Sequence, residues 1–353
     1  MAAKRGGGRW SELGLVVAIL ALGVGLTLAA DTIHVRGSDV NNFLRAENLL
    51  ANVLVPMSWV AILALGATIV IVSGGIDVSV GSVFALSALA TAAVTERLDV
   101  DAPAGEVLPL ALGVALGVGA ACGLVNGLLI VGLRLHPFIA TLGTLSIFRG
   151  LALVSVEEKT LPSLGRSLPL SFTEDGVGAR VDFAGAFLQP VPIAVMLVAA
   201  LGAWLFLART VWGREVYAVG GNEEAARYAG IAVGRVKLRV YVLAGLAAGL
   251  AGFVSTGFYQ SANTATGEGL ELAVIAAAVV GGASLSGGRG TALGAFLGAL
   301  LIKLIENGID VVKRVDFGLF ELSVSKEYAK IILGLAIVVA VAIDRVASTR
   351  RSA

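Results

Sequence analysis

Long apolar segments separated by short polar ones fill most of this chain. A helix needs about 20 apolar residues in a row to cross the hydrocarbon core of a bilayer. Seven segments are clear candidates, and three later ones are shorter or interrupted by glycine and charge. The pattern predicts an all-α, polytopic membrane helical bundle of about ten transmembrane helices in a single domain, 1–353, with spans at 13–30, 53–72, 80–94, 107–124, 138–156, 191–208, 240–258, 272–285, 291–309 and 331–343.

Composition agrees with a membrane protein. Hydrophobic residues make up 57% of the chain and charged residues 14%, with a mean hydropathy of +0.90, whereas a soluble domain carries about 25% charge. Glycine occurs 46 times, as expected where helices approach closely inside a bilayer. The net charge of +1 argues against a nucleic-acid partner, and the single cysteine, Cys122, excludes an internal disulfide.

Basic residues mark one side of the predicted bundle. Lys and Arg gather in the loops that face the cytoplasm, and here they gather before the first span, in the loop 209–239 and after the last span. The acidic residues lie mostly in the opposite loops. We therefore expect a multi-pass protein of the plasma membrane with both termini in the cytoplasm, in contact with membrane lipid.

Two segments on the expected outer side are long enough to form structure of their own. Residues 31–52 contain NNFLRAENLLANVL, an amphipathic stretch expected to lie on the membrane surface. Residues 157–190 are polar and contain Pro162 and Pro169. This second segment is either a solvated loop or a docking surface for an outside partner.

Catalytic chemistry is not evident in the chain. The phosphate-binding pattern GxxxxGK[ST] does not occur, and His34 and His136 stand far apart. We therefore expect a non-catalytic subunit with no catalytic residues and with no metal or cofactor bound by this chain.

The first motif is SGGIDVSVGS, residues 73–82. Its glycines permit turns with positive φ. Asp77 is an acidic residue between two apolar runs, where an unpaired charge is costly. Two roles remain open for it: a carboxylate that caps the next helix, or a group on a transport path.

A related pattern, VGGASLSGGRG, returns 207 positions later, at residues 280–290. In that register, Gly74, Gly75, Ser79 and Gly81 align with Gly281, Gly282, Ser286 and Gly288. Repeats of broken, glycine-rich helices are typical of transporters, although so short a match can also arise by chance.

The second motif runs from Asn126 to Leu153 and contains HPFIATLGT. Pro137 favours a helix start, and Thr141, Thr144 and Phe148 then recur at helical spacing. Such hydroxyls either bond to their own helix carbonyls or line the path of a polyhydroxylated solute. Together with Asp77 and Asn126, these three residues are the candidate translocation-path residues.

The third motif lies in the basic loop 209–239. Gly220 and Gly221 break the chain, Asn222 is placed to cap a short helix, Glu223 and Glu224 suit its first turn, and Gly230 ends it. A helix of two turns is too short to be stable alone. Either the rest of this protein or a partner must hold it.

Together, and in this order, four segments resemble the permease subunits of ribose/xylose/galactose-type ATP-binding cassette (ABC) sugar importers, within the branched-chain amino acid/sugar permease superfamily. They are SGGIDVSVGS, HPFIATLGT, GREVYAVGGNEEAARYAGI and VVGGASLSGGRGT. The resemblance covers about residues 48–344.

The resemblance implies a type II importer-like fold and a path for a monosaccharide or related polyol. It implies a second permease subunit (a homodimer or a pair), an extracytoplasmic sugar-binding protein, and a cytoplasmic ABC ATPase that uses the ATP. It also implies that the loop 209–239 couples to this ATPase, through the matching residues Gly213, Gly220, Asn222, Glu223, Ala225, Ala226 and Gly230.

An ion-coupled secondary transporter is the main alternative. It requires ionisable groups within the membrane, and the candidates are Asp77 and the helically spaced Lys303, Glu306 and Asp310. A membrane scaffold or receptor without transport activity is a third possibility. The identity of the solute stays open at this stage.

Overall fold

The computed structural model describes residues 7–35, 38–156, 158–183, 186–312, 314–316 and 321–323, with single residues between 328 and 342. The helices are α1 (Gly7–Ala29), α2 (Val55–Val72), α3 (Val80–Thr95), α4 (Ala104–Gly132), α5 (Pro137–Val154), α6 (Pro190–Arg209), α7 (Val211–Gly221), α8 (Glu223–Tyr228), α9 (Val233–Tyr259), α10 (Leu270–Val280) and α11 (Ala292–Val311). Two π-helical turns, η1 (Asn48–Leu54) and η2 (Thr173–Val177), also occur.

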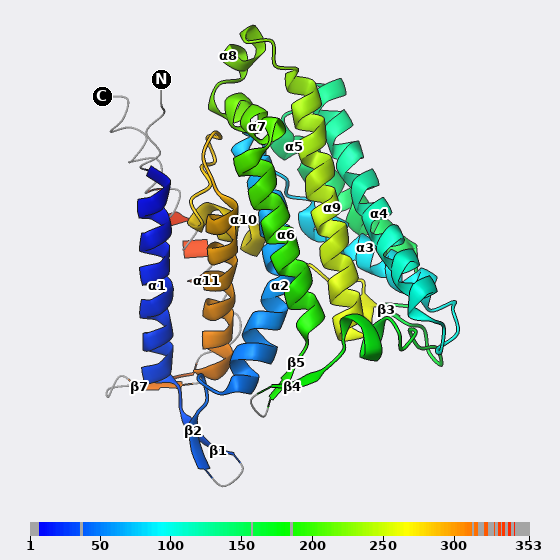
Figure 1. Ribbon diagram of the computed structural model, residues 1–353, viewed down its shortest axis with the longest axis vertical. Coiled ribbons are helices and arrows are strands. Elements are labelled where there is room, and N and C mark those ends of the chain that lie inside the picture. Colours follow the sequence, from blue (N-terminus) through cyan, green and yellow to red (C-terminus); the bar gives the residue numbers. More distant parts are fainter. Residues whose placement is uncertain are drawn as a thin grey trace.

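The strands in the described part of the chain form four two-stranded antiparallel pairs. They are β1 (Thr32–Val35) with β2 (Ser38–Asn41), β3 (Thr160–Leu161) with β6 (Ala262–Asn263), β4 (Val181–Phe183) with β5 (Ala186–Leu188), and β7 (Arg314–Asp316) with β8 (Glu321–Ser323). The hairpins β1–β2 and β4–β5 lie at the end of the bundle opposite α8 (Figure 1).

The predicted polytopic helical bundle is confirmed. Seven helices of the described residues are long and apolar enough to cross a membrane, and α3 and α10 are shorter apolar helices. The long helices run side by side between an end that carries α7 and α8 and an end that carries the hairpins (Figure 1). Six of the thirteen residues of the last predicted span, 331–343, lie outside the described residues, and the seven described ones are helical.

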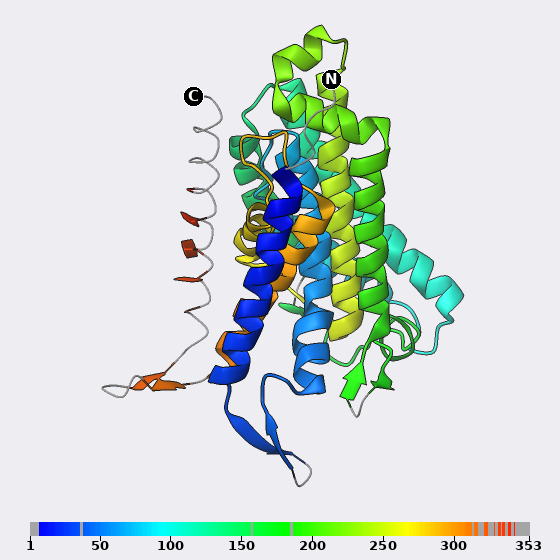
Figure 2. The same cartoon turned by 60° about the vertical axis from the view of Figure 1, so that its left-hand side comes forward.

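Helix α2 lies at the centre of the bundle. Nearly all of its side chains are buried, which agrees with a sequence that is apolar around the whole helix. Helix α11 packs beside α2 and, on its other side, against α1 (Figure 2). The small residues Ala292, Ala295 and Ala299 lie buried along α11.

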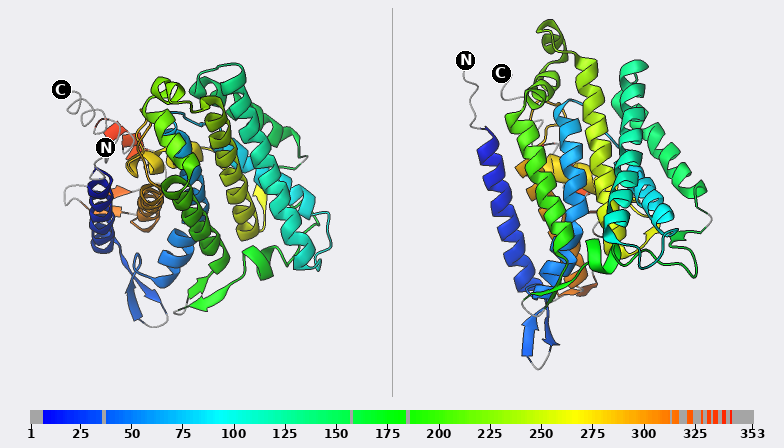
Figure 3. Two further views of the ribbon diagram at one scale, coloured as in Figure 1. Left: turned by 45° about the horizontal axis from the view of Figure 1, so that its top comes forward. Right: turned by 45° about the vertical axis from the view of Figure 1, so that its right-hand side comes forward.

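Helices α4 and α9 pack through glycines, and Figure 3 shows them side by side. A Cβ atom added to Gly119 would lie 2.2 Å from the Gly245 carbonyl oxygen, and one added to Gly245 would lie 2.1 Å from the Gly119 carbonyl oxygen. Only glycine permits so close a backbone approach. Inside a bilayer, burial of apolar surface does not drive helices together, so they associate by close packing through small residues.

The segment 31–52, which was expected to lie on the membrane surface, divides into two parts. Its first part forms the β1–β2 hairpin, and its last part forms η1, which continues directly into α2. Asn48 of η1 exchanges two hydrogen bonds with Asn307 of α11, at 3.0 and 2.8 Å. A buried amide must find such a partner, so this pair draws the segment into the bundle.

Much of the other long segment, 157–190, packs against the helices. Phe172 is fully buried, with its ring 5.3 Å from that of Phe253 of α9. Gln189 donates to the Gly178 carbonyl at 3.3 Å. The segment therefore forms a folded cap over the end of α9, with the β4–β5 hairpin at its edge.

Candidate functional site

The loop between α6 and α9 contains two helices, of which the sequence predicted only the second. Helix α7 begins where Thr210 Oγ1 accepts a hydrogen bond from the Gly213 amide at 2.9 Å. A side chain at Gly213 would collide with the Phe206 carbonyl, 2.2 Å from its Cβ position. Thr210 is the sequence signal for this helix, because threonine is a common N-cap residue.

Helix α8 has the ends predicted for it. Asn222 Oδ1 accepts a hydrogen bond from the Ala225 amide at 2.9 Å, which is the predicted cap. Gly230 has φ +84°, and the Ile231 amide donates to the Ala226 carbonyl at 3.0 Å. These are the features of a Schellman motif, which closes a helix at a left-handed glycine.

The protein itself holds α8 in place. Glu223 accepts from Lys237 Nζ of α9 at 2.6 Å and pairs with Arg227 at 3.1 Å. Ala226 is only 4% exposed and packs in an apolar cluster with Val233 and Val236. The short helix is thus fixed against α9 by one face, which leaves its other face at the surface.

Glu224, Ala225 and Tyr228 lie exposed on α8, as does Arg227, which pairs with Glu223. Tyr228 is 90% exposed, an unusual environment for a large aromatic side chain, and tyrosines are frequent anchors in protein interfaces. The sequence did not single out Tyr228. We call Glu224, Ala225 and Tyr228 the tip surface.

At the base of α7, three glycine-containing segments meet. A Cβ atom on Gly220 would lie 1.8 Å from the Val72 carbonyl oxygen, and one on Gly287 would lie 2.5 Å from the Gly220 carbonyl oxygen and 3.0 Å from the Cα of Gly74. The Gly288 amide donates to the Val72 carbonyl at 2.8 Å. We call the contact among Gly74, Gly220, Gly287 and Gly288 the glycine junction.

The junction joins the two loops that the sequence aligned as a repeat. After α2, the Gly74 amide donates to the Ile71 carbonyl at 2.9 Å, and after α10 the Gly282 amide donates to the Val279 carbonyl at 2.9 Å. Gly74 and Gly282 have φ values of +84° and +93°. The two helices thus end in the same way.

The predicted register of this repeat is wrong by one residue, because Gly74 corresponds to Gly282 and not to Gly281. The next helices begin after the N-cap residues Ser79 and Thr291. The second loop is therefore the longer one, and Ser286 does not correspond to Ser79.

Three of the five candidate path residues lie in one buried polar chain. Asp77 Oδ1 accepts from the amide and hydroxyl of Ser79 at 2.9 and 2.6 Å. Asn126 Nδ2 donates to Ser79 Oγ at 2.8 Å, and Thr144 Oγ1 donates to Asn126 Oδ1 at 2.6 Å. Asp77 therefore bonds to the N-cap residue of α3 rather than capping the helix itself.

The other two candidates lie near this chain. Thr141 Oγ1 donates to the Pro137 carbonyl at 3.0 Å and accepts from the Val78 amide at 3.2 Å, so it ties α5 to the loop before α3. Phe148 is buried in the main apolar core. The path role of all five residues stays a prediction. Their present contacts show how the loop after α2 is held.

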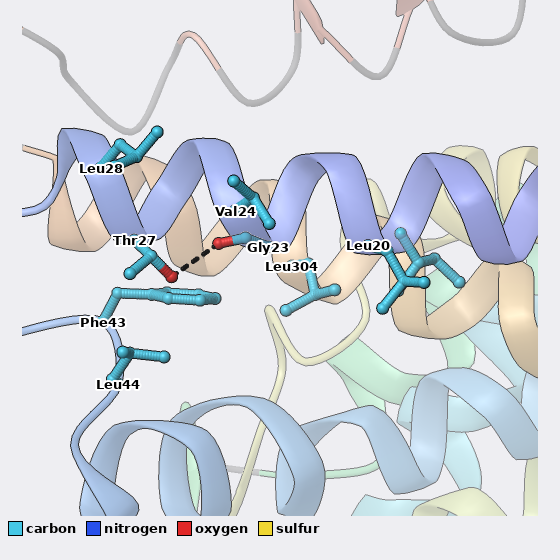
Figure 4. A pocket seen from close by; sticks show the side chains of 9 residues that line it. Leu20, Gly23, Val24, Thr27, Leu28, Phe43, Leu44 and Leu304 are labelled. Carbon is cyan, nitrogen blue, oxygen red and sulfur yellow. Dashed lines mark hydrogen bonds between the residues drawn. The ribbon is translucent and has the colours of Figure 1, made fainter.

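Two hollows lie near the end of the bundle that carries the β1–β2 hairpin. The first, about 390 Å³, is lined by apolar side chains of α1, α11 and the segment after β2 (Figure 4). Its one hydroxyl, on Thr27, donates to the Gly23 carbonyl at 2.8 Å, so it offers little to a polar solute. The second hollow, about 590 Å³, is lined by both polar and apolar groups, several of them asparagines.

Residues 49–341 match the family model described as "Branched-chain amino acid transport system / permease component". The chain belongs to this permease family. The match includes α7, α8 and both glycine loops, so the elements described above are parts of a membrane permease.

Several curated relatives match across most of the chain. The ribose import permease protein of Bacillus subtilis (strain 168) is 40% identical over 306 residues, 86% of each chain. The D-allose transport system permease protein of Escherichia coli (strain K12) is 34% identical over 326 residues, 91% of this chain and 90% of the relative. The autoinducer 2 import system permease protein of Enterobacter sp. (strain 638) is 37% identical over 295 residues, 84% of this chain and 78% of the relative. No solved structure matches the chain.

Proposed function

We propose that this chain is the membrane-spanning permease subunit of an ABC importer for a monosaccharide or a related polyol. The relatives include permeases named for ribose and D-allose import, which supports a sugar as the solute. The autoinducer 2 relative widens the solute class to other small polar molecules. A separate ATPase uses the ATP, and an extracytoplasmic binding protein delivers the solute.

The tip surface is the proposed docking site of the ATPase. The observation that carries this proposal is a helix fixed to α9 by Ala226 and Glu223, with Tyr228 left 90% exposed at the far end of the bundle. A rigid, outward-facing aromatic residue loses little conformational entropy on binding. On this proposal the α8 end is cytoplasmic, which agrees with the basic residues of the loop 209–239.

Replacement of Tyr228 tests this assignment. Tyr228→Ala removes an exposed side chain, so the apparent melting temperature should hold while co-purification of the ATPase and solute uptake fall at least tenfold. Phe187→Ala is the matched control, because Phe187 is a 64% exposed aromatic residue of β5 at the opposite end. Equal uptake and co-purification in both variants would contradict the docking site.

The same system tests the alternative. Uptake into vesicles that carry the permease alone, driven by a proton or sodium gradient, would favour an ion-coupled transporter and overturn the ABC assignment.

We also propose that two copies pair in the membrane, as the family resemblance implies. The mass of the purified permease in lipid nanodiscs tests this pairing, and a single copy in a transport-competent complex would contradict it.

A further inference from the structure

The second hollow lies at the end of the bundle opposite α8. It is formed where η1 and the start of α2 meet the ends of α9 and α11, beside the β1–β2 hairpin, and it holds about 590 Å³. That volume lies within the usual range of small-molecule sites. Its polar and aromatic lining comprises Arg45, Asn48, Asn52, Tyr259, Lys303 and Asp310, joined by Asn42 and Asn307.

Packing fixes the floor of the hollow. Asn48 and Asn307 are buried and hold each other through two reciprocal hydrogen bonds, and Asn52 donates to Asn48 Oδ1 at 3.2 Å. Tyr259 at the rim packs against Trp59, with ring centroids 5.4 Å apart. The lining groups are therefore positioned before any ligand arrives.

One donor at this site is unused. The Nε atom of Arg45 is buried and has no hydrogen-bond partner in the described part of the chain. A buried donor without a partner is costly, but this atom has almost no accessible surface, so the contacts to a ligand in the hollow come from the other lining groups. The nearest ion pair of Arg45, to Glu47 at 3.6 Å, uses Nη1 and leaves Nε free.

The charges of the hollow favour a neutral ligand. Arg45 and Lys303 oppose a cation, whereas Asp310 opposes an anion. Lys303 already pairs with Glu306 at 2.7 Å. Asparagine amides both donate and accept hydrogen bonds, as sugar hydroxyls do, and an aromatic rim offers an apolar face to a sugar ring.

We propose that this hollow is a binding subsite for a neutral polyhydroxylated solute on the outer side of the permease. This proposal rests on the proposed function. The sequence analysis considered Lys303, Glu306 and Asp310 as candidates for ion coupling. On this proposal they have another role: Lys303 and Asp310 line a solute site at the outer end of α11, and Glu306 pairs with Lys303. Lys303 and Asn52 are the residues whose polar groups hold the solute.

Saturation-transfer NMR on the permease in lipid nanodiscs tests the subsite, with D-ribose, D-xylose and D-allose as probes. We expect transfer to at least one sugar, with at least a fivefold loss in Lys303→Met and Asn52→Leu. Arg166→Gln is the matched control, because Arg166 is also a cation paired with a glutamate, Glu96 at 3.8 Å, but it does not line the hollow. Lys303→Arg should retain binding.

Each outcome separates this proposal from the proposed function. If the complete importer takes up a sugar but the permease shows no transfer, or the variants bind like the parent protein, the subsite is wrong and the importer stands. If Lys303→Met and Asn52→Leu keep their melting temperatures and bind sugar normally but no longer bind the extracytoplasmic binding protein, the hollow receives a side chain of that partner. The subsite is then again wrong. If no sugar is transported with all partners present, the function itself fails.

Discussion

Gly220 occupies the point where α7 meets the loops after α2 and α10, and its replacement by alanine is the sharpest test of the glycine junction. The new Cβ would lie 1.8 Å from the Val72 carbonyl oxygen and 2.7 Å from the Gly288 amide nitrogen. Those two groups are themselves hydrogen bonded, at 2.8 Å. The methyl group must therefore push backbone apart, because no flexible side chain lies in its way.

The cost follows from two effects. Overpacking a tight interior costs about 1–3 kcal/mol, and leaving a buried backbone donor and acceptor without each other adds about 1–3 kcal/mol. We expect Gly220→Ala to lower the free energy of unfolding by about 2–6 kcal/mol. Helix α7 directly precedes α8, which carries the tip surface. We therefore expect the variant also to transport less solute per ATP hydrolysed.

Gly221→Ala is the matched control. Gly221 is the next residue of the same helix, and a Cβ there has nothing within 4 Å. Alanine is also the better helix former by about 1 kcal/mol, so this variant should keep or raise the melting temperature. Thermal unfolding in detergent and uptake in proteoliposomes measure both variants. Equal melting temperatures for the two would refute the junction as a tight backbone contact.

Three further predictions concern packing, a polar chain and a surface. Gly119→Leu should lower stability by about 3 kcal/mol or more because it forces α4 from α9, whereas Gly117→Leu, where a Cβ meets nothing within 4 Å, should melt like the parent. Thr144→Val should cost about 1–3 kcal/mol, since it leaves a buried amide oxygen without its donor, and Thr144→Ser should restore most of the melting temperature. Ala226→Trp should destabilise by about 1–3 kcal/mol, while Ala225→Trp on the exposed face should change stability by less than about 0.5 kcal/mol and reduce ATPase co-purification. The reverse ranking in any pair would contradict the corresponding contact.

Local signals in the sequence predicted local features correctly. Asn222 and Gly230 each act through hydrogen bonds within a few residues, so the cap and the end of α8 were readable from the chain. The length of the apolar segments likewise predicted the bundle, because a helix needs about 20 apolar residues to cross a bilayer. In these cases the physics that decides the structure lies in one short segment.

Features that depend on distant partners were not predictable. Asn48 and Asn307 are 259 positions apart. The sequence around Asn48 does not show that its side chain pairs with the Asn307 amide, which draws η1 into the bundle. The repeat was misaligned by one residue because glycine identity was matched, whereas the backbone matches the first left-handed position after each helix. The sequence does not predict the hollow for the same reason, since its lining comes from segments that only the fold brings together.

Helix α11 connects the two proposed sites. It begins beside Gly290, whose carbonyl accepts from Tyr217 of α7 at 2.7 Å, and Lys303 and Asn307 near its other end line the hollow. A helix of 20 residues is about 30 Å long, and a closely packed interior transmits strain. A shift of α7 should therefore alter the hollow: addition of the ATPase should change amide hydrogen exchange in residues 303–311 together with 217–221. Tyr217→Phe keeps the ring and removes the bond to Gly290, so it should weaken the change at 303–311 and leave ATPase binding intact. A change confined to α7 in the parent protein would show that the helix does not transmit the movement.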